Sequence, residues 1–403
     1  MSLREFYDAI KDCDNDELAT LLSMNHSRFS TSSGLPLLTD KRTLYSQGKT
    51  GTCWLSSALL CISSYLKKIK GIEITEESTF SKSYLIYYDK LERTERFLSL
   101  IDSNIDDEHR TRYILNHLMT DRGQWNMAKN LILKYGLIPY RAMPDPFHRK
   151  SSVDLNVSIN ILLKFYALQL KNGISVNEKV YMKKNIINTV RTMLVQLLGE
   201  PPTEIDIPDI FQCENRISPQ HFFHMYIDFP FDDYLFICNF APENNSFYEV
   251  AFDNNMTDGM PEILLNLSDS DFQLAILNQL KRDGFCWYTC DTAKGFCMEN
   301  NSFDDPDNYG IFSGLSSYDM VRNKLSSPNH AMVLISDDQY SKGRWLLSHN
   351  SKSSFNSGSY VFVSKAWLNK YAFQAVVHKS CITLDFLHLP YYQIMPYDLF
   401  FSL

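Results

Sequence analysis

The sequence predicts an α+β fold, because helical patterns fill the chain up to Asp232 and strand patterns dominate the part that follows. In the first part, apolar residues recur at three- and four-residue steps, whereas short continuous or alternating apolar runs begin at Tyr234. A length of 403 residues exceeds one ordinary hydrophobic core, so two or more lobes are expected. The 44% hydrophobic content indicates a globular chain and not a disordered one.

Three parts are predicted, with boundaries at 1–140, 141–232 and 233–403. The helices expected in the first two parts start at Cys53 and span about 80–99, Gly123–Tyr135, Val153–Leu170 and Val176–Leu198. The third part is strand-rich, with one amphipathic helix over Asp271–Lys281. Its expected strands are Tyr234–Cys238, Ser246–Phe252, Gly284–Thr289 and a hairpin that begins at His330.

The stretch from Gln47 to Trp54 has the features of a nucleophilic cysteine. The apolar pattern turns helical directly after Cys53, which predicts a thiol at a helix N-terminus, where N–H groups and the macrodipole favour a thiolate. Gln47 can bring its side-chain amide to the reacting centre, and the Cys53 backbone N–H supplies a second donor for an oxyanion. Taken alone, the stretch also fits an ordinary buried cysteine on an amphipathic helix.

A histidine and an asparagine far downstream complete the pattern. His330 opens one strand-like run, Asn350 closes the next, and Asp337–Gly343 between them is a turn by composition. A hairpin centred on Tyr340 pairs residue 330 with residue 350, which places the two side chains about 5 Å apart at Cβ. Asn350 could then orient the imidazole, while His349 points to the other face of the sheet.

The order Gln-x5-Cys-Trp, then a strand-initial His, then Asn-Ser resembles the papain-like cysteine peptidases. In that signature the His and Asn follow the Cys by roughly 130–150 residues, and the greater separation here implies a large insertion. The branch that the chain resembles is the bleomycin hydrolase family, which includes bacterial aminopeptidase C. Segments that carry this resemblance lie at 80–93, 123–139, 287–291 and 358–368, in order along nearly the whole chain.

The resemblance implies a papain-like two-lobe fold, with a helical lobe, an antiparallel β-barrel-like lobe and an enlarged helical insertion. It also implies a cytosolic thiol aminopeptidase that hydrolyses N-terminal peptide and related amide bonds through Cys53, His330 and Asn350, with Gln47 as oxyanion donor. In the family the C-terminal arm lies in the cleft, so the Leu403 carboxylate is expected to bind the free N-terminus of a peptide substrate. A homo-oligomer, a hexamer by resemblance, is expected.

Departures from the family pattern keep other functions open. Asn350-Ser351-Lys352-Ser353 stands where the family usually has Asn-Ser-Trp-Gly, and Arg122 stands beside Gly123 where paired glycines line the substrate cleft. Gly123 and Arg122 are therefore expected to bind substrate. The alternatives are a catalytically weakened homologue that acts as a binding or scaffold protein, and another thiol acyl-transfer amidase. Asp121 and Asp291 fit either a cleft-lining role or structural hydrogen bonding.

Composition bears on compartment and partners. The formal net charge of −8 and the lack of a long basic run make nucleic acid an unlikely partner, and no apolar run is long enough to span a membrane. An acidic N-terminus without an apolar stretch and nine cysteines fit a cytoplasmic protein. The spacings of Cys286, Cys290 and Cys297, and of His221 and His224, miss the usual zinc patterns, so no metal or organic cofactor is expected.

Overall fold

The computed structural model describes residues 45–48, 50–75, 79–146, 152–211, 216–297, 301–305, 314–336, 345–351, 360–386 and 388–395. By their internal contacts these residues form two compact units. We call the described parts of Leu44–Asp232 and Glu249–Ile263 the helical unit, and those of Asp233–Tyr248 and Leu264–Leu403 the sheet unit. The predicted division into three parts, with boundaries at 140 and 232, is not tested by this division into two units and stays a prediction.

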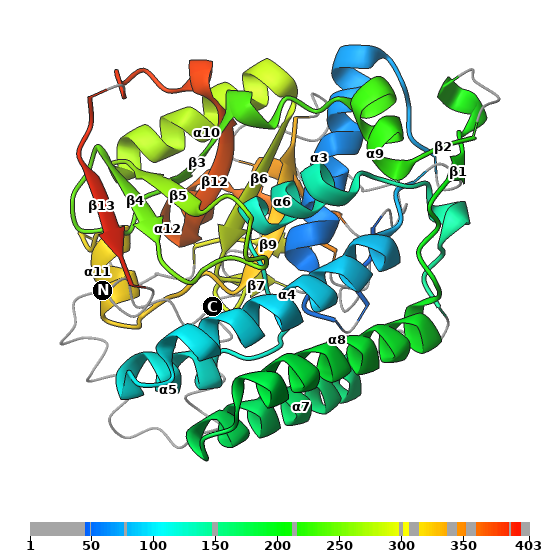
Figure 1. Ribbon diagram of the computed structural model, residues 1–403. Helices are drawn as coiled ribbons and strands as arrows, with labels where there is room; N and C mark the ends of the chain where they lie inside the picture. Colours follow the sequence, from blue (N-terminus) through cyan, green and yellow to red (C-terminus); the bar gives the residue numbers. More distant parts are fainter. Residues whose placement is uncertain are drawn as a thin grey trace, which may run out of the picture. The chain divides into compact units, whose positions relative to one another are not determined.

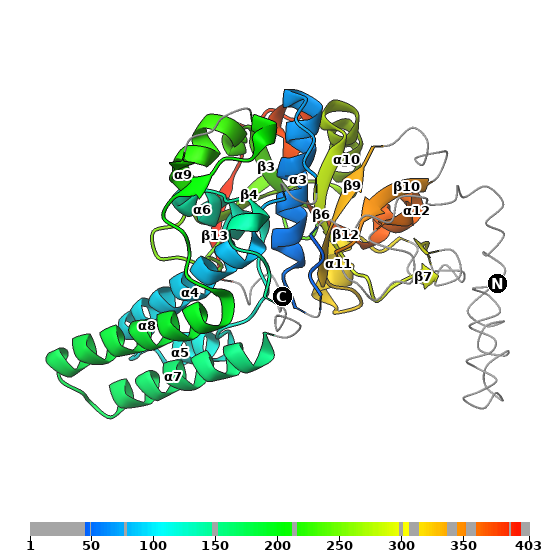
Figure 2. The same ribbon diagram turned by 90° about the vertical axis from the view of Figure 1, so that its right-hand side faces the viewer.

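Six α-helices of nine or more residues make up most of the described helical unit (Figure 1). They are α3 (Cys53–Lys70), α4 (Lys82–Asn104), α5 (Glu108–Asn116), α6 (Trp125–Tyr135), α7 (Val153–Lys171) and α8 (Val176–Leu198). Helices α7 and α8 pack against each other and against α4, and Figure 2 shows the three side by side. A short helix, α9 (Pro219–Phe222), packs against α6, and β1 (Ile205–Asp206) pairs with β2 (Arg216–Ile217).

The helix boundaries follow local signals that the sequence carries. Gly71 ends α3 in the left-handed conformation, at φ +68°, and Gly136 ends α6 at φ +77°. Ser175 and Glu178 form a capping box at the start of α8. The predicted helices at Cys53 and over Val176–Leu198 are confirmed. Helix α5 was not predicted, because its nine residues expose most side chains and bury only Thr111 and Ile114.

One 11-stranded mixed sheet runs through the sheet unit, in the order β13-β4-β5-β3-β12-β6-β9-β10-β11-β8-β7. In chain order its strands are β3 (Tyr234–Cys238), β4 (Ser246–Val250), β5 (Glu262–Asn266), β6 (Phe285–Cys290), β7 (Phe296–Cys297), β8 (Ser302–Phe303), β9 (His330–Ile335), β10 (Trp345–His349), β11 (Tyr360–Ser364), β12 (Ala372–His378) and β13 (Tyr391–Ile394). Three helices connect strands of this sheet along the chain: α10 (Asp269–Asp283), α11 (Ser317–Arg322) and α12 (Lys365–Tyr371). Helix α10 packs on β6 and β12, where a buried cluster that includes Phe272, Ile276 and Trp367 forms the core.

The sheet is mixed, so the lobe expected to be antiparallel is not antiparallel throughout. Strand β3 pairs with β5 in parallel, and so does β11 with β8. Parallel pairing requires a long crossover, and both pairs have one: β4 lies between β3 and β5 in the chain, and β9 and β10 lie between β8 and β11. The mixed α+β fold class is confirmed.

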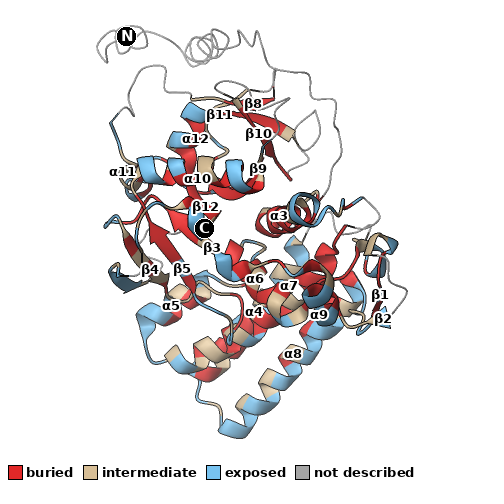
Figure 3. Cartoon of the chain, turned by 90° about the horizontal axis from the view of Figure 1, so that it is seen from above, coloured by how far each residue is buried: buried red, intermediate tan, exposed pale blue. Residues whose placement is uncertain are grey.

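Burial differs strongly between individual elements. Figure 3 shows buried positions along the sheet strands and α3, whereas much of α8 is exposed. Within the described residues, no helix is long and apolar enough to cross a membrane.

Candidate active site

Cys53 is the first residue of α3 and is half-buried. The first turn of this 18-residue helix carries no acidic side chain of its own, so the helix itself places no negative charge at the positive end of its dipole. The next residue, Trp54, is buried and its Nε1–H donates to the Asp121 carbonyl at 2.7 Å. A thiol in this position has the helix-terminal environment that favours a thiolate.

Gln47 lies in the turn that leads into α3. Its Nε2 donates to the Thr50 carbonyl at 2.9 Å, and the Thr50 hydroxyl donates back to the Gln47 carbonyl at 2.7 Å. These reciprocal bonds fix the carboxamide on the same turn as Cys53. A primary amide has two N–H bonds, so the contact with Thr50 uses one of them. The oxyanion role of Gln47 stays a prediction.

The segment 121–123 packs directly against the nucleophile turn. The Gly51 N–H points to Asp121 Oδ2 at 3.4 Å, and a Cβ added at Gly123 would lie 2.6 Å from Trp54 Cε2. Glycine is therefore required at 123 by the indole ring, whatever it does for substrate. Arg122 is exposed, and its carbonyl accepts a hydrogen bond from Arg93 Nη2 at 2.8 Å. The predicted substrate contacts of Gly123 and Arg122 remain predictions.

His330 and Asn350 meet in the sheet unit, from neighbouring strands. His330 begins β9, Asn350 follows β10, and His330 Nε2 is 2.8 Å from Asn350 Oδ1. Both side chains are buried, with 7% and 1% of their surface exposed, so water competes little for this bond. An asparagine oxygen can only accept, so the ring must carry its proton on Nε2. The predicted His–Asn contact is present.

The register that brings them together differs from the predicted one. His349 pairs with Val333 and Ser348 with Leu334, so residue 350 comes opposite 332 and not opposite 330. His330 and Asn350 are diagonal neighbours on one face, a separation of about 7–8 Å that an imidazole and a carboxamide can span. Ile335 pairs with Leu347 and not with residue 345, so the pairing is centred on residue 341 instead of Tyr340. As expected, His349 faces the other side, where its ring packs edge-on against Tyr360.

A buried carboxylate holds the turn that precedes His330. Asp291 is 3% exposed and accepts hydrogen bonds from Ser326 Oγ at 2.7 Å and from Asn329 Nδ2 at 2.5 Å. The Asn329 N–H donates to the Cys290 carbonyl at 3.0 Å. Of the two roles left open for Asp291, these contacts support structural hydrogen bonding. Ser326 and Asn329 are more than thirty positions from Asp291, so no local sequence signal revealed these two partners.

The remaining candidate ligands are scattered. Cys286 and Cys290 are buried on β6, and burial raises the pKa of the Cys286 thiol. Cys297 is half-buried, and His221 and His224 are exposed on the surface of the helical unit. No group of three or more His, Cys, Asp or Glu side chains suited to a metal ion occurs among the residues that the structure describes.

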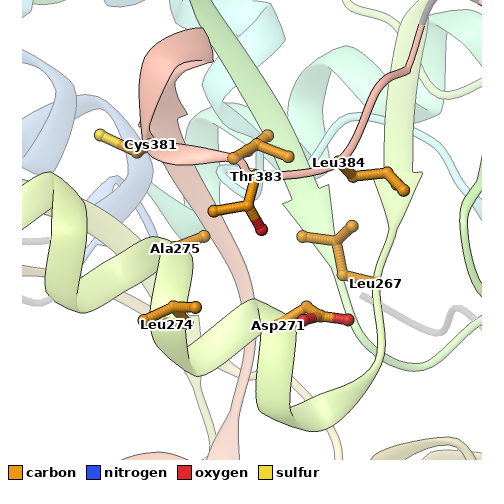
Figure 4. A pocket seen from close by; sticks show the side chains of 8 residues that line it. Leu267, Asp271, Leu274, Ala275, Cys381, Thr383 and Leu384 are labelled. Atoms are coloured by element: carbon orange, nitrogen blue, oxygen red, sulfur yellow. The ribbon is translucent and has the colours of Figure 1, made fainter.

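A small hollow in the sheet unit lies apart from these residues. Figure 4 shows it between α10 and the segment 381–384, with Leu267 on its wall. Its lining is mainly apolar, with Asp271 and Thr383 as the polar side chains, and includes none of the predicted catalytic residues. Leu403 and Lys352 lie outside the described residues, so the structure does not bear on the C-terminal carboxylate or on the departure from Asn-Ser-Trp-Gly.

Comparisons with known proteins find relatives that match most of the chain. Aminopeptidase C of Listeria monocytogenes is 26% identical over 368 residues, which cover 87% of this chain and 82% of the relative. Aminopeptidase C of Lactobacillus delbrueckii is 27% identical over 373 residues, covering 86% and 81%. The crystal structure of PepW from Lactobacillus rhamnosis matches with a TM-score of 0.78 at 22% identity, over 98% of this chain and 97% of that one.

The family match covers most of the chain. Residues 11–399 match the Peptidase C1-like family. The chain therefore belongs to the Peptidase C1-like family, which confirms the predicted relationship to papain-like peptidases and the predicted class of enzyme, a cysteine peptidase.

Proposed function

We propose that this protein is a thiol aminopeptidase in which Cys53 is the nucleophile, His330 the general acid and base, and Asn350 the residue that orients the imidazole. The observation that carries the proposal is the buried 2.8 Å contact between His330 Nε2 and Asn350 Oδ1. A buried hydrogen bond of this kind holds the imidazole in one tautomer and one orientation, as a general base requires. Relatives named aminopeptidase C support the aminopeptidase specificity.

The proposed chemistry follows from which ring nitrogen Asn350 engages. With Nε2–H donating to Asn350, the other nitrogen, Nδ1, takes the proton of the Cys53 thiol. The thiolate attacks the carbonyl carbon of the first peptide bond, and the Gln47 amide with the Cys53 N–H stabilises the oxyanion. His330 then protonates the departing amine and afterwards takes a proton from the water that hydrolyses the thioester.

The finer parts of the proposal concern specificity and setting. We place the protein in the cytoplasm, with the Leu403 carboxylate binding the substrate amino group and Gly123 and Arg122 beside the scissile bond. These roles follow the family pattern stated above.

Self-association is a further part of the proposal. Large apolar side chains, each more than half exposed, recur at steps of three and four along one face of α7. This apolar face of α7 consists of Val153, Val157, Ile161, Phe165 and Leu168. Contiguous exposed apolar surface of this kind is typical of a protein interface. It supports the expected homo-oligomer.

One experiment tests the activity directly. An aminoacyl fluorophore with an unblocked amino group is compared with its N-acetylated twin, under reducing conditions, for wild type and for Cys53→Ala. We expect hydrolysis of the unblocked substrate alone and its loss in Cys53→Ala. A matched variant, Cys297→Ala, removes another half-buried thiol and should retain full activity.

Each other result has a defined meaning. Cleavage of both substrates supports the proposed peptidase activity but rejects the proposal that the Leu403 carboxylate binds the substrate amino group. Hydrolysis that persists in Cys53→Ala rejects Cys53 as the nucleophile. Failure of the wild type to hydrolyse either substrate rejects the aminopeptidase and favours a different acyl substrate or a binding role.

A further inference from the structure

Asp121 is a hub of hydrogen bonds within the helical unit. Its side chain is 10% exposed, and its two carboxylate oxygens accept from four donors on three different segments. Lys90 Nζ on α4 lies 2.8 Å from Oδ1, and Asn156 Nδ2 on α7 lies 3.0 Å from the same atom. Oδ2 receives the Ser152 hydroxyl, ahead of α7, and the Gly51 N–H at 3.4 Å.

The backbone of the same segment is anchored as firmly. The Asp121 carbonyl accepts from Trp54 Nε1 at 2.7 Å, and the Thr120 carbonyl accepts from Lys90 Nζ at 2.6 Å. Asp121 therefore contacts the residue two before Cys53 through its side chain and the residue directly after Cys53 through its backbone. The two contacted residues, Gly51 and Trp54, thus lie on either side of Cys53 in the sequence.

The electrostatic state of this hub is well defined. Lys90 is 1% exposed, and burial lowers its pKa while the Asp121 carboxylate raises it. Burial alone would raise the pKa of Asp121, but the Lys90 ammonium and the hydrogen bonds from Ser152 and Asn156 hold it well below its usual range. The carboxylate is thus charged throughout the neutral range and remains a four-fold acceptor.

We propose that Asp121 is a positioning residue for the nucleophile, and that buried Lys90 fixes the carboxylate so that the turn from Gly51 to Trp54 presents Cys53 in one orientation. The inference rests on the proposed function, because it takes Cys53 to be the nucleophile. Asp121 does not touch the reacting atoms. It acts through Gly51 and Trp54.

Two double variants of equal charge separate positioning from stability. Lys90→Met/Asp121→Asn and Lys90→Met/Asp121→Leu both remove the buried ion pair, which neutral side chains of similar volume can often replace without loss of stability. Asn and Leu have nearly the same shape, but only Asn can accept the Gly51 N–H. The Leu variant should melt at a lower temperature, because Gly51, Ser152 and Asn156 lose this acceptor. Measured below the unfolding transition of both variants, kcat should be lower in the Leu variant by on the order of 10- to 100-fold, with KM changed little.

A second readout does not depend on turnover. The rate at which iodoacetamide alkylates Cys53, located by mass spectrometry at pH 7, should be at least several-fold slower in the Leu variant. Since both variants carry the same charges, such a difference reports the geometry at the helix N-terminus. Equal kcat and equal alkylation rates in the two double variants would overturn the proposal.

A single variant and its match cover the case in which the Leu variant does not fold. Asp121→Asn and Glu92→Gln each break one lysine–carboxylate pair that involves α4 and whose carboxylate is buried. Glu92 is 5% exposed and pairs at 2.8 Å with Lys134, which is 37% exposed. In Asp121→Asn the neutral amide no longer pairs with the Lys90 ammonium, so kcat and Cys53 alkylation should change, whereas Glu92→Gln should leave both unchanged. Equal effects of the two variants would refute the inference. Absence of Cys53-dependent hydrolysis in the wild type would instead reject the proposed function, and the alkylation rates would still decide the role of Asp121.

Discussion

Replacing Asn350 by alanine tests the arrangement on which the proposed mechanism depends. The side chain is 1% exposed and its Oδ1 lies 2.8 Å from His330 Nε2, so the variant removes the acceptor of a buried N–H without admitting bulk water. A hydrogen bond to a charged group contributes about 1.5–3 kcal/mol, and each 1.36 kcal/mol corresponds to a factor of ten in rate. We therefore expect kcat/KM to fall by about 10- to 150-fold, chiefly in kcat, because the bond holds the imidazole and not the substrate.

The assay is steady-state hydrolysis of the unblocked aminoacyl fluorophore, with thermal melting measured on the same samples. The matched control is Asn301→Ala, since Asn301 is another buried asparagine of the sheet unit whose Nδ2 donates to the Tyr360 carbonyl at 2.6 Å. The control should lose stability and keep its kcat. A fall of less than threefold in kcat/KM for Asn350→Ala, or an equal fall in the control, would refute the role assigned to Asn350.

Two further predictions concern stability and assembly. Glu262 is fully buried and neither carboxylate oxygen has a hydrogen-bond partner among the described residues, so burial and then the nearby Asp253 raise its pKa well above the usual value. When the folded-state pKa lies above the unfolded one, the free energy of unfolding falls as pH rises past the unfolded value. Glu262→Gln should therefore raise the free energy of unfolding by about 1–3 kcal/mol at pH 7 and change it little at pH 4.5. Equal melting temperatures of wild type and variant at both pH values would contradict this. On the apolar face of α7, Ile161→Glu with Phe165→Glu should dissociate the proposed homo-oligomer in sedimentation velocity, and a wild type that already sediments as a 46.8 kDa monomer would reject that interface.

The sequence predicted the elements that carry Cys53 and His330 well, because each element begins at a local pattern. A helix that begins at Cys53 follows from apolar periodicity, and a strand that begins at His330 follows from the polar turn before it. The hairpin register was wrong by a shift that moves Asn350 from opposite residue 330 to opposite residue 332. A shift of this size keeps the parity of the strand, and both side chains therefore stay on one face and still meet.

Long-range pairing limited the prediction of the fold. Strand β12 lies between β3 and β6 in the sheet, and its partners are about 85–140 positions away, so nothing near Ala372–His378 indicates a central strand beyond a buried apolar run. The parallel pairs β3–β5 and β8–β11 likewise depend on crossovers and not on local pattern. Local periodicity specifies which face of an element is buried, whereas the order of strands depends on which apolar faces fit together.

Asp121 and Asp291 illustrate why the role of a buried carboxylate cannot be predicted from local sequence. One carboxylate lies in each unit, each accepts hydrogen bonds from a turn, and each of those turns leads into a proposed catalytic residue, Cys53 in one case and His330 in the other. Desolvating a carboxylate is unfavourable, and its pairing or hydrogen bonding restores the loss only when every donor is in place. A loop that must satisfy such an acceptor has few alternative conformations, whereas an apolar side chain would tolerate many. We therefore interpret both acids as determinants of loop geometry more than of stability, which is why the decisive comparison at Asp121 is between two variants of equal charge and similar shape, only one of which has a side-chain oxygen that accepts hydrogen bonds.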